Sequence, residues 1–433
     1  MKARLTLALA LCTILCACAG PSLRYKNEID RLFERGKFEV AADRIEANRS
    51  KMYGERDEML FHLDTASAVH AAHMNERSNS SLAAAQDKME DLEVRSIAGG
   101  IGTLLINDYT QPYRARVFER AFSHFMRGMD LLALGEDNGA VVEARRAVFF
   151  LDYTRERQSG YNDDAFVQFF ASMMFEDRGQ LSSARIARNN ALNAYENQRG
   201  FSSARAPDFQ PPPPRERRGK GELIVFHLNG RAPLIISQEI MLAWNDVWFT
   251  VQGNNDLQGV PQSTINAVFA GAFGRSVTVS FPQLVASNYL ITTSAVNGVA
   301  TQLVSDIGAA LRQTLNEERT AAFARTVTRA VTKYILSVQS RHFAQKATGD
   351  ETVGQLVGIF MSALSNVTEK ADTRSWFTLP AEVRMASLWL PAGQHDIRLV
   401  SYDNTGRAVD ERLFENVQIN EGGRTYLYHR TAR

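Results

Sequence analysis

The chain has 433 residues, of which 45% are hydrophobic, so it is long enough to bury the cores of two or three domains. Its 49 basic and 48 acidic residues give a formal net charge of +1, which excludes the strongly basic footprint of a nucleic-acid-binding protein. All three cysteines lie at or before position 18, so no later thiol is present for a disulfide, a redox pair or a thiolate metal site.

Residues 1–17 are typical of a bacterial signal peptide. Two basic residues precede an apolar run at 5–15, which is too short to span a bilayer. Residues 15–18 (LCAC) resemble a lipobox, which implies cleavage before Cys18 and its acylation, for example with palmitate. The alternative is a plain secretory signal cut nearby. Ala19 and Gly20 follow instead of an aspartate, and by the enterobacterial sorting rule this implies the periplasmic face of the outer membrane. Several acyl chains anchor a protein far better than one.

Residues 117–196 are predicted to form two helical hairpins in series. Apolar residues recur every three or four positions on both sides of a glycine, as on one face of an α-helix. Gly135 and Gly179 make these turns, and Gly36 makes another within 24–47. Alanines follow the glycines at offsets of five or twelve positions, which lets the second helix lie close to the first. These alanines are Ala41, Ala140, Ala147, Ala184 and Ala191.

This spacing resembles the tetratricopeptide (TPR) pattern, in which a turn glycine is followed by two alanines at the same offsets. Gly128 matches the small residue of the family's first helix. The chain lacks the usual tryptophan and closing proline, and Gly135 and Gly179 lie 44 residues apart rather than about 34. An ordinary helical bundle with small residues at tight crossings is the alternative. We predict an all-α, TPR-like array, lipid-anchored, over 18–199.

Stacked hairpins expose a continuous inner face that binds peptides or partner helices. Polar residues on the first helix of each hairpin are therefore the candidate partner-binding residues. They are His124, Arg127 and Gln168. Asp163 and Asp164 are predicted to cap a helix that begins near Ala165, because helix N-termini favour carboxylates.

A proline-rich basic linker is predicted at 200–221, either as a solvated spacer or as a surface for anionic headgroups or glycan. From 222 to 433 the hydrophobic period changes and predicts an α/β domain. The expected elements are strands within 222–292 (among them 247–252, 276–280 and 289–292), helices at 296–315, 317–345 and 351–370, and a C-terminal β module at 374–433. We expect the strands to join one sandwich-like sheet with the helices inserted. The predicted fold class is therefore α+β.

Several stretches of the chain resemble known families. The phrase PAGQHDIRL resembles the PEGA-type modules of bacterial surface proteins. Longer stretches resemble an uncharacterised family of Gram-negative outer-membrane lipoproteins with TPR-like repeats. They are LINDYTQPYRARVFERAF, ALGEDNGAVVEARRA, GELIVFHLNGRAPL, AFARTVTRAVTKY and ADTRSWFTLPAEVRMASLWLPAG. The resemblance implies a role in the cell envelope, because members of that family are often encoded beside a lipoprotein activator of peptidoglycan synthases.

The sequence nominates no catalytic, metal or cofactor site. The only histidine cluster in the sequence is His62, His70 and His73. His70 and His73 lie one helical turn apart and could both face a metal, but no carboxylate is placed as a third ligand. A pair that is hydrogen-bonded within the protein or exposed to solvent is the favoured interpretation. Asp372 and Arg374, close to a tryptophan, are interpreted as a buried charge pair. No serine-hydrolase, zinc-protease or kinase motif is present.

The main hypothesis is a protein–protein interaction scaffold, not an enzyme, that uses no cofactor and binds no nucleic acid. Its expected partners are envelope proteins bound by the helical array, and the membrane through Cys18, with peptidoglycan as a further candidate. The alternative is a regulator or enzyme of peptidoglycan synthesis. A deep pocket in which four charged side chains converge would favour that alternative. These side chains are Asp306, Arg325, Asp372 and Arg374.

Overall fold

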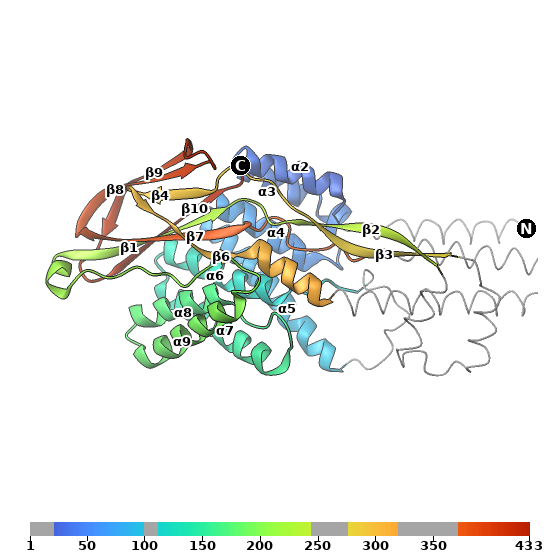
Figure 1. Ribbon diagram of the computed structural model, residues 1–433, viewed down its shortest axis with the longest axis horizontal. Coiled ribbons are helices and arrows are strands. Elements are labelled where there is room, and N and C mark those ends of the chain that lie inside the picture. Colours follow the sequence, from blue (N-terminus) through green and yellow to red (C-terminus); the bar gives the residue numbers. More distant parts are fainter. Residues whose placement is uncertain (1–20, 99–110, 244–275, 319–370) are drawn as a thin grey trace, which may run out of the picture.

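The computed structural model describes residues 21–98, 111–243, 276–318 and 371–433. Several predicted features lie outside these ranges: the signal peptide, Cys18, the strand at 247–252, Arg325, the helix at 351–370 and nearly all of the helix at 317–345. Within the described ranges the fold is α+β, as predicted, with helices in the N-terminal part and sheets in the C-terminal part (Figure 1).

The N-terminal helices pack as consecutive pairs, α2 with α3, α4 with α5, α6 with α7 and α8 with α9 (Figure 1). Their bounds are α2 Leu23–Glu34, α3 Phe38–Ala47, α4 Glu58–Ala71, α5 Asn75–Ala98, α6 Val117–Ala133, α7 Asp137–Arg157, α8 Ala165–Asp177 and α9 Leu181–Gln198. A short π-helix, η1 (Arg49–Tyr53), leads from α3 towards α4. The predicted hairpins at 24–47 and 117–196 are confirmed as α2–α3, α6–α7 and α8–α9.

The glycine turns have the predicted backbone. Gly36, Gly135 and Gly179 have φ angles of 65°, 76° and 67°, a conformation that glycine adopts without strain. The alanines that follow them are at most 2% exposed, so each second helix lies against its neighbours through a small side chain. At Gly128 an added Cβ would lie 3.0 Å from the ring of Phe170, which shows how closely α6 and α8 approach.

The strands form a central sheet, an outer sheet and a two-stranded ribbon. The central sheet has the order β10-β1-β7-β6, the outer sheet β5-β4-β8-β9, and the ribbon pairs β2 with β3. In the central sheet β1 pairs parallel with β10 and antiparallel with β7. The bounds are β1 Lys220–Asn229, β2 Leu234–Ala243, β3 Ser276–Val285, β4 Thr293–Val296, β5 Val299–Ala300, β6 Gln302–Asp306, β7 Glu382–Pro391, β8 Gly393–Tyr402, β9 Ala408–Ile419 and β10 Arg424–Thr431.

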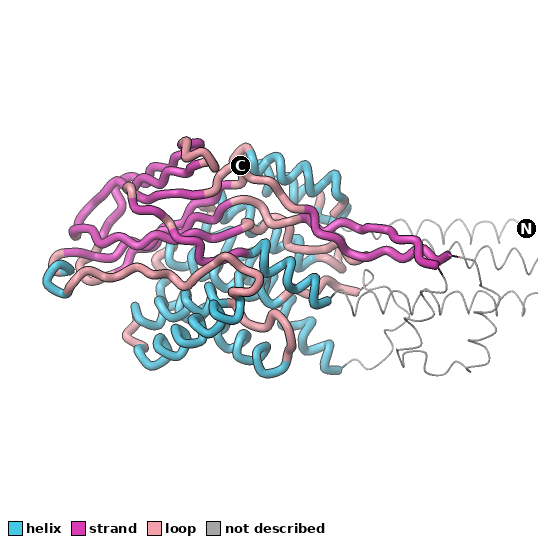
Figure 2. The backbone as a smooth tube through the Cα atoms, in the orientation of Figure 1, coloured by secondary structure: helices cyan, strands magenta, loops and turns pink. Residues whose placement is uncertain are grey.

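The central sheet is packed on both faces. On one face the Phe226 ring of β1 lies 5.3 Å from Phe125, with Phe166 and Phe170 beside it, so helices and sheet share one hydrophobic core. On the other face Leu223 of β1 packs in a second core with β8 residues such as Ile397. This gives three layers, helices, central sheet and outer sheet, and the β2–β3 ribbon projects away from the end that carries β8 and β9 (Figure 2).

The predicted helix at 296–315 is wrong in its first half. Residues 293–306 form β4, β5 and β6, and the helix covers 307–318. Asn297 and Gly298 both have positive φ, as in the two-residue hairpin turn that Asn-Gly favours. This turn forces the chain back on itself where a helix was expected.

The predicted strands at 222–292 do not all join one sheet. β1 joins the C-terminal strands, but β2 and β3 pair only with each other among the described strands. The strand at 276–280 is confirmed as the first half of β3, whereas 289–292 is not a strand, because β4 begins at residue 293.

Residues 200–221 are not a free spacer along their whole length. Ala204 is 2% exposed, and the Arg205 amide donates to the Leu303 carbonyl of β6 at 3.1 Å. A 3₁₀ turn, η3 (Pro214–Arg217), follows the proline run and leads directly into β1. The segment therefore packs in part along the body, and its exposed arginines are Arg205 near its start and Arg215 and Arg218 near its end.

Among the helices of the described ranges, none combines the length and apolar character that crossing a bilayer requires.

Candidate functional site

The three predicted partner-binding residues lie inside the protein rather than on an open groove. His124 is 4% exposed and Gln168 is fully buried. His124 Nδ1 lies 2.8 Å from a Glu143 carboxylate oxygen, and Arg127 Nη1 lies 3.1 Å from the other oxygen. The Gln168 amide donates to Asp163 at 3.2 Å. Glu143 therefore holds His124 and Arg127, and Asp163 accepts from Gln168, whose buried side-chain oxygen has no hydrogen-bond partner; the three residues offer little surface to a partner.

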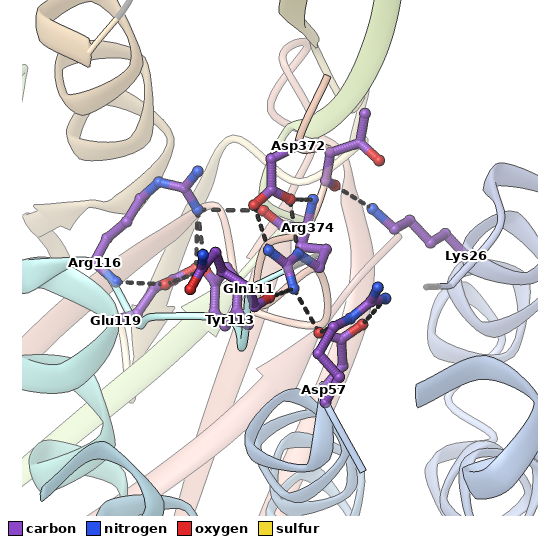
Figure 3. A network of polar contacts seen from close by, with 10 residues as sticks. Lys26, Asp57, Gln111, Tyr113, Arg116, Glu119, Asp372 and Arg374 are labelled. Carbon is purple, nitrogen blue, oxygen red and sulfur yellow. Dashed lines mark hydrogen bonds and ion pairs between the residues drawn. The ribbon is translucent and has the colours of Figure 1, made fainter. Parts of the chain in front are cut away.

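The inner face of α4 and α6 is closed by the chain's own residues 371–381 (Figure 3 shows their first contacts). Trp376 is 1% exposed; its backbone amide donates to Glu119 at 3.0 Å and its indole to Ser67 at 2.8 Å. Thr378 donates to Asp64 at 2.8 Å. This segment has no helix or strand, turns after Trp376, and occupies the inner face of the helices as a bound peptide would.

Arg374 is the charged centre of that contact (Figure 3). Its guanidinium donates to Asp57 at 2.7 Å and to Asp372 at 2.7 and 2.8 Å, and also to the Gln111 carbonyl. Arg374 is 3% exposed and the Asp57 side chain is fully buried. Burial would raise the pKa of Asp372, but the hydrogen bonds and charge of Arg374 hold it below its usual value. The predicted buried charge pair is confirmed, and it joins the start of α4 to the C-terminal part.

Two further ionisable groups line this contact between residues 371–381 and the helices, which we call the joint. Lys26 of α2 donates to the Thr373 carbonyl at 2.8 Å, and burial lowers the pKa of its ammonium to about 8. Asp64 of α4 is fully buried, and burial raises its pKa to about 7 despite hydrogen bonds from Thr378 and Tyr53. Both shifts have the sign that loss of water gives to a charged group.

The four charged residues that would have favoured an enzyme do not line an open pocket together. Arg374 is buried against the helices, Asp372 beside it is partly exposed, and Arg325 lies outside the described residues. Asp306 accepts a hydrogen bond from the Ala309 amide at 2.8 Å, so it caps the helix at 307–318. Asp164 likewise caps α8, as predicted, by accepting from the Val167 amide.

The histidine cluster is held by other side chains. His70 is 1% exposed, lies 2.7 Å from Asp130 and stacks on Tyr428 at a centroid distance of 4.0 Å. His73 lies against the same tyrosine, and burial lowers its pKa to about 4. His62 lies 3.9 Å from Glu58 on its own helix. Within the described ranges no group of His, Cys, Asp and Glu has the arrangement of a metal site.

A cleft of about 890 Å³ opens between the C-terminal end of α8 and the end of the central sheet where β1 begins. We call it the α8–β1 cleft. Residues 207–217, the end of β7, the turn from β9 into β10 and residues of α6, α7 and α9 complete its walls. Its aromatic and basic lining residues are Phe169, Phe209, Trp389, Tyr426, Arg178, Arg188, Arg217 and Arg424.

An ionic cluster occupies one side of the α8–β1 cleft. The Arg424 guanidinium donates to Glu176 at 2.9 Å, to Asp177 at 2.9 Å and to Glu222 at 2.7 Å. Burial raises the pKa of Asp177, and the Arg424 charge offsets only part of this effect. The cluster fixes the end of α8 to β1 and β10, so this side of the cleft is rigid.

Trp389 of β7 lies beside this cluster on the central sheet, because it is the register partner of Glu222, which in turn is the register partner of Arg424. It is partly exposed near the end of β7, and the Arg217 guanidinium lies 5.4 Å from its ring centroid, within the range of a cation–π contact. Arg217 also donates to the Pro212 carbonyl, which fixes the proline-rich segment beside it. The cleft therefore offers a charged cluster with an aromatic side chain directly beside it.

Sequence reasoning missed this cleft because its walls come from six separate parts of the chain. The local signals were the charged run Glu176-Asp177-Arg178 at the end of a predicted helix and the lone Trp389 in a predicted strand. Neither signal shows that the two lie in one cleft. No family model, curated protein or solved structure matches this chain.

Proposed function

We propose that this protein is an outer-membrane lipoprotein, anchored through Cys18 on the periplasmic face, and that it acts as a binding scaffold rather than as an enzyme. The α8–β1 cleft carries the proposal. Its partner would be an envelope protein that inserts a polypeptide segment there. The anchor rests on the leader and the lipobox-like sequence.

The composition of the cleft suits a protein partner. Tryptophan, tyrosine and arginine are the side chains that contribute most often to binding energy in protein interfaces, and Trp389, Tyr426 and four arginines line this cleft. The pairing of its arginines with carboxylates limits the entropy lost when a partner binds. A cleft of this volume accommodates several residues of an extended segment.

We also propose that the hairpins α6–α7 and α8–α9 are degenerate TPR repeats, because they keep the glycine and alanine spacing of that family. Their use differs from that of a typical TPR groove. Since residues 371–381 lie against the inner face, an external partner has more access to the α8–β1 cleft than to that face.

The test is crosslinked co-purification of the lipidated protein from intact cells, with Trp389→Ala compared to the unchanged chain. Phe149→Ala is the matched control, because Phe149 is an aromatic residue that is 77% exposed on α7 and does not line the cleft. We expect specific envelope proteins to be recovered with the unchanged chain and the control, and to be lost with Trp389→Ala. Retention of the same proteins by Trp389→Ala would show that they dock elsewhere.

A regulator or enzyme of peptidoglycan synthesis is the second candidate. The partly exposed Trp389 beside polar side chains also suits a sugar ring, since aromatic faces stack on apolar surfaces. Sedimentation with insoluble peptidoglycan distinguishes the two. Recovery of the unchanged chain, but not of Trp389→Ala, in the pellet would favour this candidate over the protein scaffold.

A further inference from the structure

The chain between the proposed anchor and the body is short. Ser22 caps α2 by accepting from the Tyr25 amide, so the first helix of the described residues begins there. Four residues separate Cys18 from Leu23, and the five Cα–Cα steps between them span at most about 18 Å when fully extended. The N-terminal end of α2 is therefore held near the bilayer if Cys18 is acylated. This inference rests on one part of the proposed function, the acylation of Cys18.

Contacts along α2 show at which end of the central sheet the N-terminal end of this helix lies. Lys26, in its first turn, reaches the Thr373 carbonyl, whereas Phe33, near its last turn, lies 5.8 Å from the Arg430 guanidinium at the end of β10. From Thr373 the chain leads to Ala381, whose amide donates to Asn229 at the end of β1. The N-terminal end of α2 therefore lies beyond the end of β1.

The α8–β1 cleft lies at the other end of the same strand. Glu222, near the start of β1, lines the cleft, and the strand then runs to Asn229, a distance of about 23 Å at 3.3 Å per residue. Figure 1 shows β8 and β9 at the cleft end and the β2–β3 ribbon projecting from the opposite end. The body thus has two distinct poles along its long axis.

The surface at the α2 pole suits a bilayer. Leu23 is 48% exposed and Arg24 beside it is exposed, so the first turn of α2 offers an apolar side chain and a cation. Such a pair fits the boundary between acyl chains and anionic headgroups. The outward residues of β2, including Glu239, are also exposed as the ribbon leaves the body.

We infer that the N-terminal end of α2 and the β2–β3 ribbon form the membrane-facing pole, and that the α8–β1 cleft points away from the bilayer. A partner in the periplasm or in the peptidoglycan layer then reaches the cleft without competing with the membrane. The bilayer is the partner of one pole, and a periplasmic protein is the partner of the other.

The test uses single labels on the lipidated protein. Because all the cysteines lie at or before position 18, an introduced cysteine is the only free thiol of the acylated mature chain. The variants Leu23→Cys, Glu239→Cys and Ser182→Cys each carry a fluorophore; Ser182 is exposed in the first turn of α9, beside the cleft end of α8. The protein is reconstituted in phosphatidylethanolamine–phosphatidylglycerol vesicles, with and without a headgroup nitroxide.

We expect the fractional quenching at positions 23 and 239 to be at least threefold that at position 182. Equal quenching at 239 and 182, or stronger quenching at 182, would overturn the orientation. Intact-mass measurement of each preparation reports acylation of Cys18 separately, so a missing acyl mass refutes the anchor and not the geometry. A histidine tag in place of Cys18, bound to nickel-chelating lipid, then tests the same tether without acylation.

Discussion

Replacement of Arg374 by methionine tests whether residues 371–381 belong to the interior of the helical array. Methionine keeps the apolar length of the side chain and removes the guanidinium. The change breaks the hydrogen bonds to Asp57, to Asp372 and to the Gln111 carbonyl. Since Asp57 is fully buried, its charge cannot be resolvated without opening the structure.

The expected loss is about 3 kcal/mol of unfolding free energy. Removal of one partner of a buried ion pair costs about 3–5 kcal/mol, because an uncompensated charge remains. The lower value applies here for two reasons. Asp57 keeps a second arginine, Arg56, at 2.8 Å, and the Asp372 side chain is 29% exposed and regains water.

Urea unfolding of the chain without residues 1–18, monitored by its tryptophan fluorescence, measures this loss. Arg398→Met is the matched control, because Arg398 is 60% exposed and pairs with Glu411 at the surface, where such pairs contribute less than about 1 kcal/mol. In the double variant Asp57→Asn/Arg374→Met the loss should fall at least about 1 kcal/mol short of the sum of the single losses. A loss no greater than that of the control would refute the buried joint.

Three other predictions follow from the same interior. Burial raises the pKa of Asp64 to about 7 in the folded chain, against about 3.9 in the unfolded chain. The protonated carboxyl therefore contributes its full stability below pH 4, and this contribution is lost as the pH rises through 7. The free energy of unfolding should fall by about 4 kcal/mol over this range. Asp64→Asn should flatten the profile of urea midpoint against pH between 4 and 7, and an unchanged slope would contradict this. Gly128→Val should lower the free energy of unfolding by about 1–3 kcal/mol, because its Cβ would lie 3.0 Å from the buried ring of Phe170. Gly200→Ala is the control, and it should be nearly neutral in the same urea titration because no atom lies within 4 Å of its Cβ. Because helices and central sheet share one core, far-UV circular dichroism and intrinsic tryptophan fluorescence should report one unfolding transition, and two separated transitions would show independent domains.

The helical hairpins were predictable because their determinants are local. Gly135 and Gly179 permit a left-handed turn, and the alanines that follow permit a close helix crossing, so a few dozen residues specify each pair. The cap at Asp164 and the ion pair between Arg374 and Asp372 are likewise short-range features. The Asn297-Gly298 turn was also a local signal, and the apolar run after it was interpreted as a helix instead.

By itself, then, the sequence determined the class of the fold, the paired helices and the positions where the chain turns. Tertiary structure alone decided that β1 pairs with β10, some 200 residues later, that 371–381 fill the inner face of the helices, and that a cleft forms between α8 and β1. His124 and Gln168 show the reason. A helical period identifies which residues share a face, but whether that face meets solvent or another segment depends on contacts between residues far apart in the chain, which periodicity does not encode.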